Sequence, residues 1–379
     1  PLAEPKLEEL LKSNQASGRL AYTTDFTRIK DCDTLWITFD TPVDDNDNAD
    51  LSAIYRIVEL AVPHLGNGVL IVLSSQLPVG TSRKIKELIE RKRPGLKFDY
   101  AYVPENLRLS DAVRCFFNPE RIVVGADSPA ALEKVKKILA QLPADILSMS
   151  SISAEMTKHA LNAFLATSLS FIYDVADACE AVGADVIDVA KALRSDSRIG
   201  EKAYLDASLG FSGGTLGRDL KALLSIVGNH RVTLPVIESV FKKNQLRKGL
   251  VLQRLNGELG SLKNKTIAIF GLTYKAGTST LRRSLALEVA TDLEKSGASL
   301  RLYDPRADRK DILKDPYRAA LGAQVIVAMT PWPEFKNLNL TKLRQGMQAP
   351  AIFFDTRNFF YDQESGMRAA GFKYLGIGR

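Results

Sequence analysis

Gly68-Val69-Leu70-Ile71-Val72-Leu73 is the stretch that decides the fold. Its apolar residues follow one another without the polar alternation of a strand that has one face in water. Such a run is typical of a strand in a parallel sheet that helices cover on both faces. Amphipathic helices are predicted on either side, from Leu51 to about Leu65 and around Lys84–Lys92. Further strands are expected near residues 34–39, 98–103 and 121–125, and a helix is expected from Ser128-Pro129 to about Leu142.

The rest of the chain divides into a helical segment and a second α/β region. Strand signals vanish between Ser153 and about Gly257, where one long helix is predicted over residues 153–182. Strands and helices alternate again from Thr266-Ile267-Ala268-Ile269-Phe270-Gly271 onward. The expected fold is α/β, with two Rossmann-like doubly wound domains at residues 1–150 and 261–379. A central helical domain, which could also serve dimerisation, is expected at residues 151–260.

Composition excludes several classes of protein. The chain has 51 basic and 44 acidic residues, a net charge of +7, and the basic side chains are dispersed. Nucleic-acid binders concentrate such charge on one face, so no nucleic-acid partner is expected. No apolar run approaches the ~20 residues that span a bilayer, so no membrane partner is expected and the cytoplasm is the predicted location. The three cysteines and three histidines lack the spacing of a zinc site, so no metal is expected.

The glycine-rich fingerprint of a dinucleotide-binding domain, G-x-G-x-x-G, is absent from this sequence. The chain opens instead with a helix pattern, Leu7-Glu8-Glu9-Leu10-Leu11-Lys12. An α/β domain without its first β-α-β unit would look like this. We therefore expect the first domain to be incomplete at its N-terminus.

Short motifs throughout the chain carry a resemblance to one family, and they stand in that family's order. The motifs are Glu4-Pro5, Thr23-Thr24-Asp25, Thr41-Pro42, Pro78-Val79-Gly80-Thr81, Pro104-Glu105-Asn106-Leu107-Arg108, the run from Ala154 to Phe164, Asp196-Ser197-Arg198-Ile199-Gly200, the run from Gly210 to Asp219, Gly271-Leu272-Thr273-Tyr274-Lys275, Tyr303-Asp304-Pro305 and Arg357-Asn358. The chain resembles the UDP-glucose/GDP-mannose dehydrogenase family, the nucleotide-sugar 6-dehydrogenases. The resemblance implies an NAD-dependent oxidation of the C6 alcohol of a nucleotide sugar such as UDP-glucose, for polysaccharide biosynthesis.

The resemblance also implies the site residues. The catalytic residues would be Lys158, Asn162, Asp219, Thr215, Gln76 and Glu105. The cofactor NAD would be bound by Thr41, Pro42, Gln76, Lys275 and Arg282. The nucleotide-sugar substrate would be bound by Leu107, Arg198, Phe211, Gly213, Gly214, Lys275 and Arg357. A homodimer or a higher homo-oligomer is expected, and the long helix at 153–182 is compatible with a dimer interface or with an internal core.

The residues themselves leave more than one interpretation open. Lys158 and Asn162 are four apart, so on the predicted helix they share one face. An ammonium beside an amide donor would stabilise a developing alkoxide, although a lysine on a helix is commonly solvated. Asp219 can equally cap the helix that follows it. Glu105 can equally be a surface carboxylate.

Three departures from the family's pattern fall among the catalytic positions. Thr215 stands where the family has its catalytic cysteine, Gln76 where it has threonine, and Leu109 where it has a carboxylate. A thiolate can hold an aldehyde as a covalent adduct, whereas a threonine hydroxyl needs a base to react. The second oxidation could then use the aldehyde's hydrate, the product could be the aldehyde, or the chain could be a non-catalytic nucleotide-sugar-binding or regulatory homologue. We expect an altered but active dehydrogenase. A hydroxyacid dehydrogenase of the same layout is a third possibility.

Overall fold

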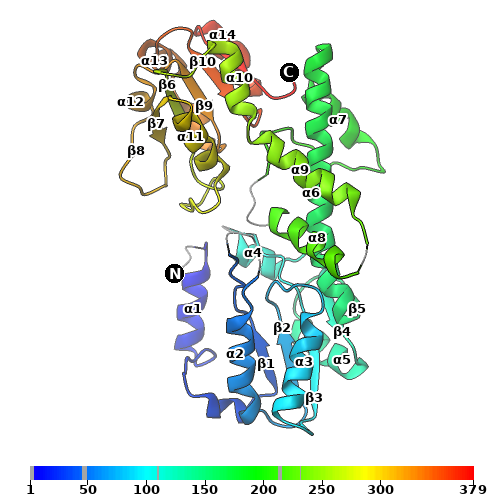
Figure 1. The fold of residues 1–379 in the computed structure, drawn as a ribbon. Helices are drawn as coiled ribbons and strands as arrows, with labels where there is room; N and C mark the ends of the chain where they lie inside the picture. The colour runs from blue at the N-terminus through cyan, green and yellow to red at the C-terminus, as the bar shows by residue number, and fades with distance from the viewer. Residues whose placement is uncertain (1–3, 45–48, 109–110, 212–215, 231) are drawn as a thin grey trace. The chain divides into compact units, whose positions relative to one another are not determined.

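A computed structural model describes residues 4–44, 49–108, 111–211, 216–230 and 232–379. The chain forms two compact units, which we call the N-terminal unit, Pro1–Leu161, and the C-terminal unit, Asn162–Arg379. The long helix α6 (Ser151–Val182) contributes residues to both units. Figure 1 gives the order of the elements along the chain.

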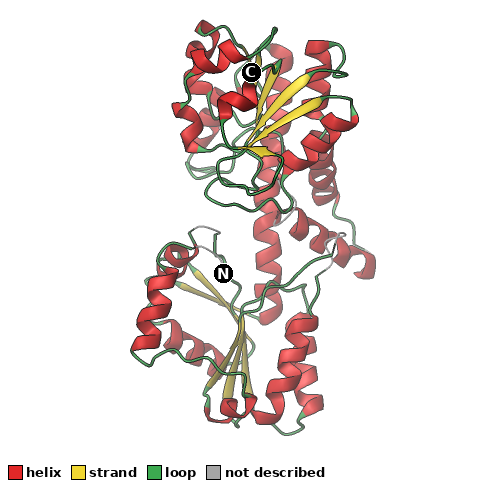
Figure 2. Ribbon diagram, turned by 90° about the vertical axis from the view of Figure 1, so that its left-hand side faces the viewer, coloured by secondary structure: helices red, strands yellow, loops and turns green. Residues whose placement is uncertain are grey.

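The sheet of the N-terminal unit is built around the apolar run at residues 68–73. Its strands lie in chain order, namely β1 (Thr34–Ile37), β2 (Val69–Leu73), β3 (Phe98–Tyr102), β4 (Ile122–Ala126) and β5 (Ile146–Met149). Every residue of β2 is buried. Ile71 and its alternate neighbours pack with α2 (Ser52–Ala61) and α3 (Thr81–Lys92). Leu70 and Val72 pack with α5 (Pro129–Leu139) on the other face, so the prediction of a sheet covered on both faces is confirmed (Figure 2).

The expectation of an entirely parallel first sheet is wrong at one place. β4 runs antiparallel to β3, with Tyr102 opposite Gly125, whereas the other strand pairs of this sheet are parallel. A parallel return needs a connection that travels back along the strand. The helix in this connection, α4 (Ala112–Phe117), has six residues and spans only about 9 Å. The connection from β4 to β5 is just as long in residues, but it contains the eleven-residue helix α5, and that pair of strands is parallel.

The predicted helices of this unit are present. Ser128 accepts a hydrogen bond from the Ala131 N–H at 3.1 Å and Pro129 opens α5, as the cap pattern predicts. The helix pattern near the start of the sequence forms α1 (Leu7–Ala16). Two 3₁₀ turns complete the unit, η1 (Phe26–Asp31) and η2 (Val62–His64).

The C-terminal unit begins with helices. After α6, which ends before Gly183, come α7 (Val186–Ser195), α8 (Arg218–His230), α9 (Pro235–Arg247) and α10 (Leu250–Leu259). Their buried residues form one core with one face of the following sheet; Ile172 of α6, Leu255 of α10 and Ile269 of the sheet belong to it. The predicted domain boundary between residues 260 and 261 stays a prediction.

The second sheet has the strand order of a doubly wound dinucleotide fold. Its strands are β6 (Thr266–Phe270), β7 (Ser299–Tyr303), β8 (Ile312–Leu313), β9 (Val325–Ala328), β10 (Ile352–Asp355) and β11 (Lys373–Leu375). All pairs are parallel, in the order β11-β10-β9-β6-β7-β8. The remaining elements are α11 (Leu285–Lys295), α12 (Pro316–Ala320), η4 (Pro333–Asn337), α13 (Leu340–Gly346), η5 (Tyr361–Gln363) and α14 (Glu364–Ala369). The order reverses between β6 and β9, where such sheets bind ligands beyond the carboxyl ends of the strands.

Candidate active site

Lys158 is held by the loop that follows β3. Its Nζ atom donates to the Glu105 carbonyl oxygen at 2.5 Å and lies 3.4 Å from the Asn106 Oδ1 atom. The Glu105 carboxylate forms an ion pair with the same ammonium at 3.5 Å. Only 10% of the Lys158 side chain is exposed. The ammonium is therefore a fixed positive charge rather than a solvated surface group, and Glu105 is its partner.

The neighbouring residues of α6 fix the loop after β2. The buried Glu155 carboxylate accepts hydrogen bonds from the Gly80 N–H at 2.6 Å and the Ser82 N–H at 2.7 Å. These amides belong to the first turn of α3, where a negative charge is stabilising. The His159 Nε2 atom lies 2.8 Å from the Leu77 carbonyl oxygen, so Nε2 carries the hydrogen. Glu155 and His159 both lie in the motif from Ala154 to Phe164, but no catalytic or binding role was predicted for either residue.

Asn162 and Asp219 meet inside the C-terminal unit. The Asn162 Nδ2 atom donates to the Asp219 Oδ2 atom, and both side chains are buried. Asp219 lies in the first turn of α8. Asn162 follows Lys158 by one turn of α6, so a charged donor and an amide donor stand in succession on one helix. Each is oriented by an oxygen acceptor from a different part of the chain.

The predicted NAD-binding residues of the N-terminal unit follow adjacent parallel strands. Thr41 and Pro42 come after β1, and Gln76 comes after β2. The hydroxyl of Ser75, beside Gln76, is buried and has no hydrogen-bond partner among the described residues. Hydroxyls and an amide at the carboxyl ends of parallel strands suit the neutral ribose and carboxamide groups of NAD. These residues therefore fit the cofactor.

Asp304 organises the loop after β6 in the C-terminal unit. Its Oδ2 atom accepts from the Leu272 and Thr273 amides at 2.7 and 3.0 Å and from the Trp332 indole at 3.2 Å. Its Oδ1 atom accepts from two further backbone amides. In a dinucleotide-binding domain an acid after the second strand binds the adenosine ribose. Asp304 is fully buried and both of its carboxylate oxygens already accept hydrogen bonds from the loops after β6 and β7, which argues against a second dinucleotide site here.

Gly271 is required at the start of that loop. Its φ is +86°, and a Cβ atom there would lie 2.6 Å from the Thr330 carbonyl oxygen. A larger residue would push apart the loops after β6 and β9, which are the two loops at the switch point.

Arg357 is presented by the turn after β10. Its backbone N–H donates to the Asp355 carboxylate at 3.1 Å and its Nε atom to the Met329 carbonyl oxygen at 3.3 Å. No described residue accepts a hydrogen bond from its two terminal nitrogens, which is the arrangement that a phosphate oxygen would complete.

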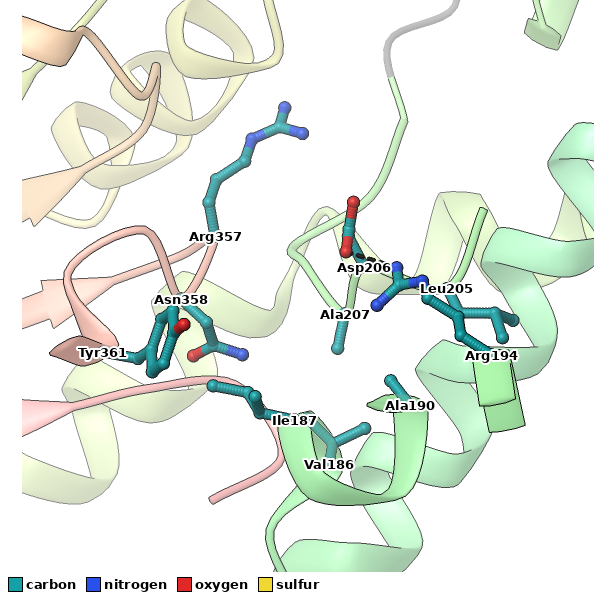
Figure 3. A pocket seen from close by; sticks show the side chains of 10 residues that line it. All are labelled: Val186, Ile187, Ala190, Arg194, Leu205, Asp206, Ala207, Arg357, Asn358 and Tyr361. Carbon is teal, nitrogen blue, oxygen red and sulfur yellow. Dashed lines mark hydrogen bonds and ion pairs between the residues drawn. The ribbon is translucent and has the colours of Figure 1, made fainter. Parts of the chain in front are cut away.

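Arg357 also borders a cavity of about 220 Å³ within the C-terminal unit. Figure 3 shows apolar residues of α7 on one side of this cavity and the Arg194–Asp206 ion pair at its rim. In the same view the Arg357 side chain extends away from Asn358 and Tyr361.

The other predicted substrate and cofactor residues are mostly exposed. Arg198 is exposed and pairs with Asp196 at 2.7 Å, and Leu107 is exposed. Lys275 and Arg282 are exposed in the segment between β6 and α11. Phe211 is buried, with its backbone bonded to a side chain of α9. Four predicted positions, Leu109, Gly213, Gly214 and Thr215, lie outside the described residues.

Models of one family match most of the chain. The NAD binding domain of the UDP-glucose/GDP-mannose dehydrogenase family matches residues 1–143, its central domain residues 152–246 and its UDP binding domain residues 268–362. The chain belongs to this family. The resemblance seen in the sequence is confirmed, and the hydroxyacid dehydrogenase alternative is wrong.

Individual relatives agree with the family match. UDP-glucose 6-dehydrogenase TuaD of Bacillus subtilis is 34% identical over 390 residues, which cover all of this chain and 84% of the relative. UDP-glucose 6-dehydrogenase of Rickettsia prowazekii is 35% identical, with 100% and 89% covered. A UDP-glucose dehydrogenase structure from Pyrobaculum islandicum is 27% identical with a TM-score of 0.86, covering 100% of this chain and 87% of that one.

The UDP-glucose/GDP-mannose dehydrogenase family fixes the enzyme class. The chain is an NAD-dependent nucleotide-sugar dehydrogenase acting on a CH–OH group, and NAD is its cofactor. The two Rossmann-like regions and the helices between them are the fold of this family. Among the described residues no helix is long and apolar enough to cross a membrane.

Proposed function

We propose that this dehydrogenase oxidises the C6 alcohol of a UDP-glucose-like nucleotide sugar. The observation that carries the proposal is the pair Lys158 and Asn162 on α6, each held by its own acceptor, Glu105 for the lysine and Asp219 for the amide. The names of the relatives at 34% and 35% identity support UDP-glucose as the substrate. Arg357 and the loop after β6 would bind its diphosphate.

Bound NAD would supply the hydride acceptor. The alcohol would lose a hydride from C6 to NAD and its hydroxyl proton to a water molecule, and an aldehyde would form. Negative charge grows on the C6 oxygen as that proton leaves. The Lys158 ammonium and the Asn162 amide would hydrogen-bond that oxygen, and because both are already oriented, little reorganisation accompanies the reaction. Asp219 would fix the Asn162 amide and orient a water molecule.

The second oxidation would differ from that of an enzyme with a cysteine at position 215. A threonine hydroxyl is a weak nucleophile unless a base removes its proton. We propose that water adds to the aldehyde to give its hydrate, with Asp219 or Gln76 positioning the water. The hydrate would then lose a hydride to a second NAD and a proton to water, which gives the uronic acid. Without that hydration the product is the aldehyde.

The number of NADH formed per sugar tests both the oxidation of the C6 alcohol and the second oxidation through the hydrate. The enzyme is incubated with excess NAD and a limiting amount of UDP-glucose, and in parallel with other UDP-sugars. Two NADH per sugar would show the acid, and one would show the aldehyde. No NADH from any UDP-sugar, together with binding of UDP-glucose, would favour the non-catalytic nucleotide-sugar-binding or regulatory homologue.

We further propose that α6 carries the interface of a homodimer. Phe164, Phe171 and Val182 are 69%, 51% and 79% exposed. With Ser168, Val175 and Ala178 they recur at alternating steps of four and three along α6, the spacing of a seam between two helices. We also propose a cytoplasmic location and a role in supplying activated sugars for polysaccharide synthesis.

A further inference from the structure

The segment Ser208–Phe211 leads into the stretch that ends at Asp219, and side chains of α9 hold it by its backbone. The Asn244 Oδ1 atom accepts from the Phe211 N–H at 2.9 Å, and its Nδ2 atom donates to the Phe211 carbonyl oxygen at 2.9 Å. Both partners are buried. One amide side chain therefore satisfies both backbone polar groups of Phe211, which fixes the direction of the backbone at this residue as well as its position.

Gly210 lets the amide come this close. A Cβ atom at Gly210 would lie 2.9 Å from the Asn244 Oδ1 atom, and its φ is +150°. A side chain here would push Asn244 away from Phe211. The glycine is therefore part of the same contact rather than a plain turn residue.

Arg247, one turn further along α9, holds the other end of the segment. Its guanidinium donates to the Ser208 carbonyl oxygen at 2.6 Å and to the Asp177 carboxylate at 2.5 Å. It also lies over the Tyr173 ring, 4.8 Å from the centroid, and the Tyr173 hydroxyl is 3.1 Å from the Ser208 hydroxyl. The arginine is 3% exposed, so these contacts are made in a desolvated site where each orients strongly.

The segment is also joined to the turn that presents Arg357. The Leu209 N–H donates to the Thr356 carbonyl oxygen at 3.0 Å. The residue before the predicted phosphate ligand and the residues leading toward Asp219 thus share a backbone hydrogen bond. A displacement of Ser208–Phe211 would therefore also displace the turn that presents Arg357.

We propose that Asn244 and Arg247 are positioning residues for the nucleotide-sugar reaction. They fix Ser208–Phe211 and so place Phe211 and the Arg357 turn relative to the substrate. The inference rests on the proposed function and goes beyond it, because neither residue touches the reacting atoms. No pattern in the sequence marks either of them, since each is an ordinary polar residue of a helix.

The test compares Asn244→Ala with Gln245→Ala, an exposed neighbour on the same helix. With the full chain, N244A should lower kcat/KM for UDP-glucose by about 10- to 100-fold, since small misplacements of a substrate cost rates of that order. The KM for NAD should stay within about twofold, because the contacts of Asn244 are made within the C-terminal unit, whereas the predicted NAD residues Thr41, Pro42 and Gln76 belong to the N-terminal unit. Asn244→Asp, which still accepts from the Phe211 N–H but cannot donate to its carbonyl, should fall between N244A and the wild type. Q245A should match the wild type.

Hydrogen exchange separates positioning from general loss of structure. In N244A the amides of Leu209 and Phe211 should exchange faster, while β6 and β9 stay protected. If N244A does not fold, Arg247→Lys carries the test, because one ammonium nitrogen replaces the two terminal guanidinium nitrogens that donate separately to Asp177 and to Ser208. Unchanged kcat/KM for UDP-glucose in a folded variant would overturn the inference. So would an equal loss of protection throughout the C-terminal unit.

This design also separates the two proposals. If the wild type makes no NADH with any UDP-sugar, the proposed function fails. The positioning inference is then judged on UDP-glucose affinity by calorimetry and on the Leu209 and Phe211 exchange rates. It fails if N244A changes neither.

Discussion

Replacing Lys158 with methionine removes the ammonium and keeps most of the apolar stem. In the structure this ammonium contacts the Glu105 carbonyl oxygen at 2.5 Å, the Glu105 carboxylate at 3.5 Å and the Asn106 amide oxygen at 3.4 Å. The Lys158 side chain is only 10% exposed, so water could not easily replace the hydrogen bonds that the ammonium makes. The substitution should therefore affect both stability and rate.

The two effects have different sizes. Leaving the partly buried Glu105 carbonyl without its donor costs about 1 kcal/mol of stability, at the low end of the range for buried groups. Removing a preorganised donor from a developing oxyanion costs about 3–4 kcal/mol of transition-state stabilisation, or a factor of about 10² to 10³ in kcat. The rate loss should therefore exceed what the stability loss explains. It should be largest in the first oxidation, the step in which the C6 oxygen gains charge.

The assay follows NADH absorbance with UDP-glucose at a temperature well below the unfolding midpoint of every variant. Lys158→Arg keeps the charge but places a planar fork in a site shaped for an ammonium, so an intermediate rate is expected. Thr157→Val is the matched control, because it changes a hydrogen bond to the helix backbone at the preceding position. A folded K158M enzyme with kcat/KM within about threefold of the wild type would refute an alkoxide-stabilising role for Lys158.

Other substitutions test the remaining parts of the site. Asp219→Asn removes the charge that holds Asn162 and should lower kcat about 10²-fold, with fewer NADH formed per sugar; unchanged stoichiometry would contradict its role with water. Thr215→Cys should make the activity sensitive to thiol alkylation and raise the yield toward two NADH per sugar, and an alkylation-resistant enzyme would argue against position 215 facing the aldehyde. Burial raises the pKa of Asp355 above 3.8 despite hydrogen bonds from Phe360, Arg357 and Tyr374, so the folded state keeps a proton that the unfolded chain loses. The unfolding free energy of the wild type relative to D355N should therefore fall as pH rises above about 4, and a flat difference would exclude this. Phe164→Glu should shift light-scattering mass from dimer to monomer, and no shift would remove α6 from the interface.

Much of the fold was accessible because short-range patterns reflect burial. The continuous apolar run of β2 predicts cover on both faces, and the structure places alternate residues under α2 and α3 and under α5. The long helix was predicted as 153–182 and found as Ser151–Val182, since it has neither proline nor glycine to break it. In each case one element's own sequence is enough.

Features that depend on distant partners were missed. The reversed direction of β4 appears only in its pairing with β3, which neither strand's own sequence reveals, and β8 has only two residues, too few for a periodic signal. The hydrogen bonds that join Asp304 to the loop after β6, and Asn244 to Phe211, link residues about thirty positions apart in each case. Motif matching placed Lys158, Asn162 and Asp219 among the catalytic residues. Motif matching did not show that Glu105 accepts a hydrogen bond from Lys158, or that Asp219 accepts one from Asn162.

This network of acceptors bears directly on what a threonine at position 215 changes. The described contacts of Lys158 come from the loop after β3, and the amide of Asn162 donates to a residue of α8. These contacts are made by Glu105, Asn106 and Asp219, and residue 215 itself lies outside the described residues. Removal of hydride from the alcohol needs the stabilised oxygen that they provide, whereas the thioester route needs a thiol. A substitution at position 215 should therefore leave the oxidation of the alcohol in place and change only the steps after the aldehyde. For the same reason, the number of NADH formed per sugar is a more informative measurement than the initial rate.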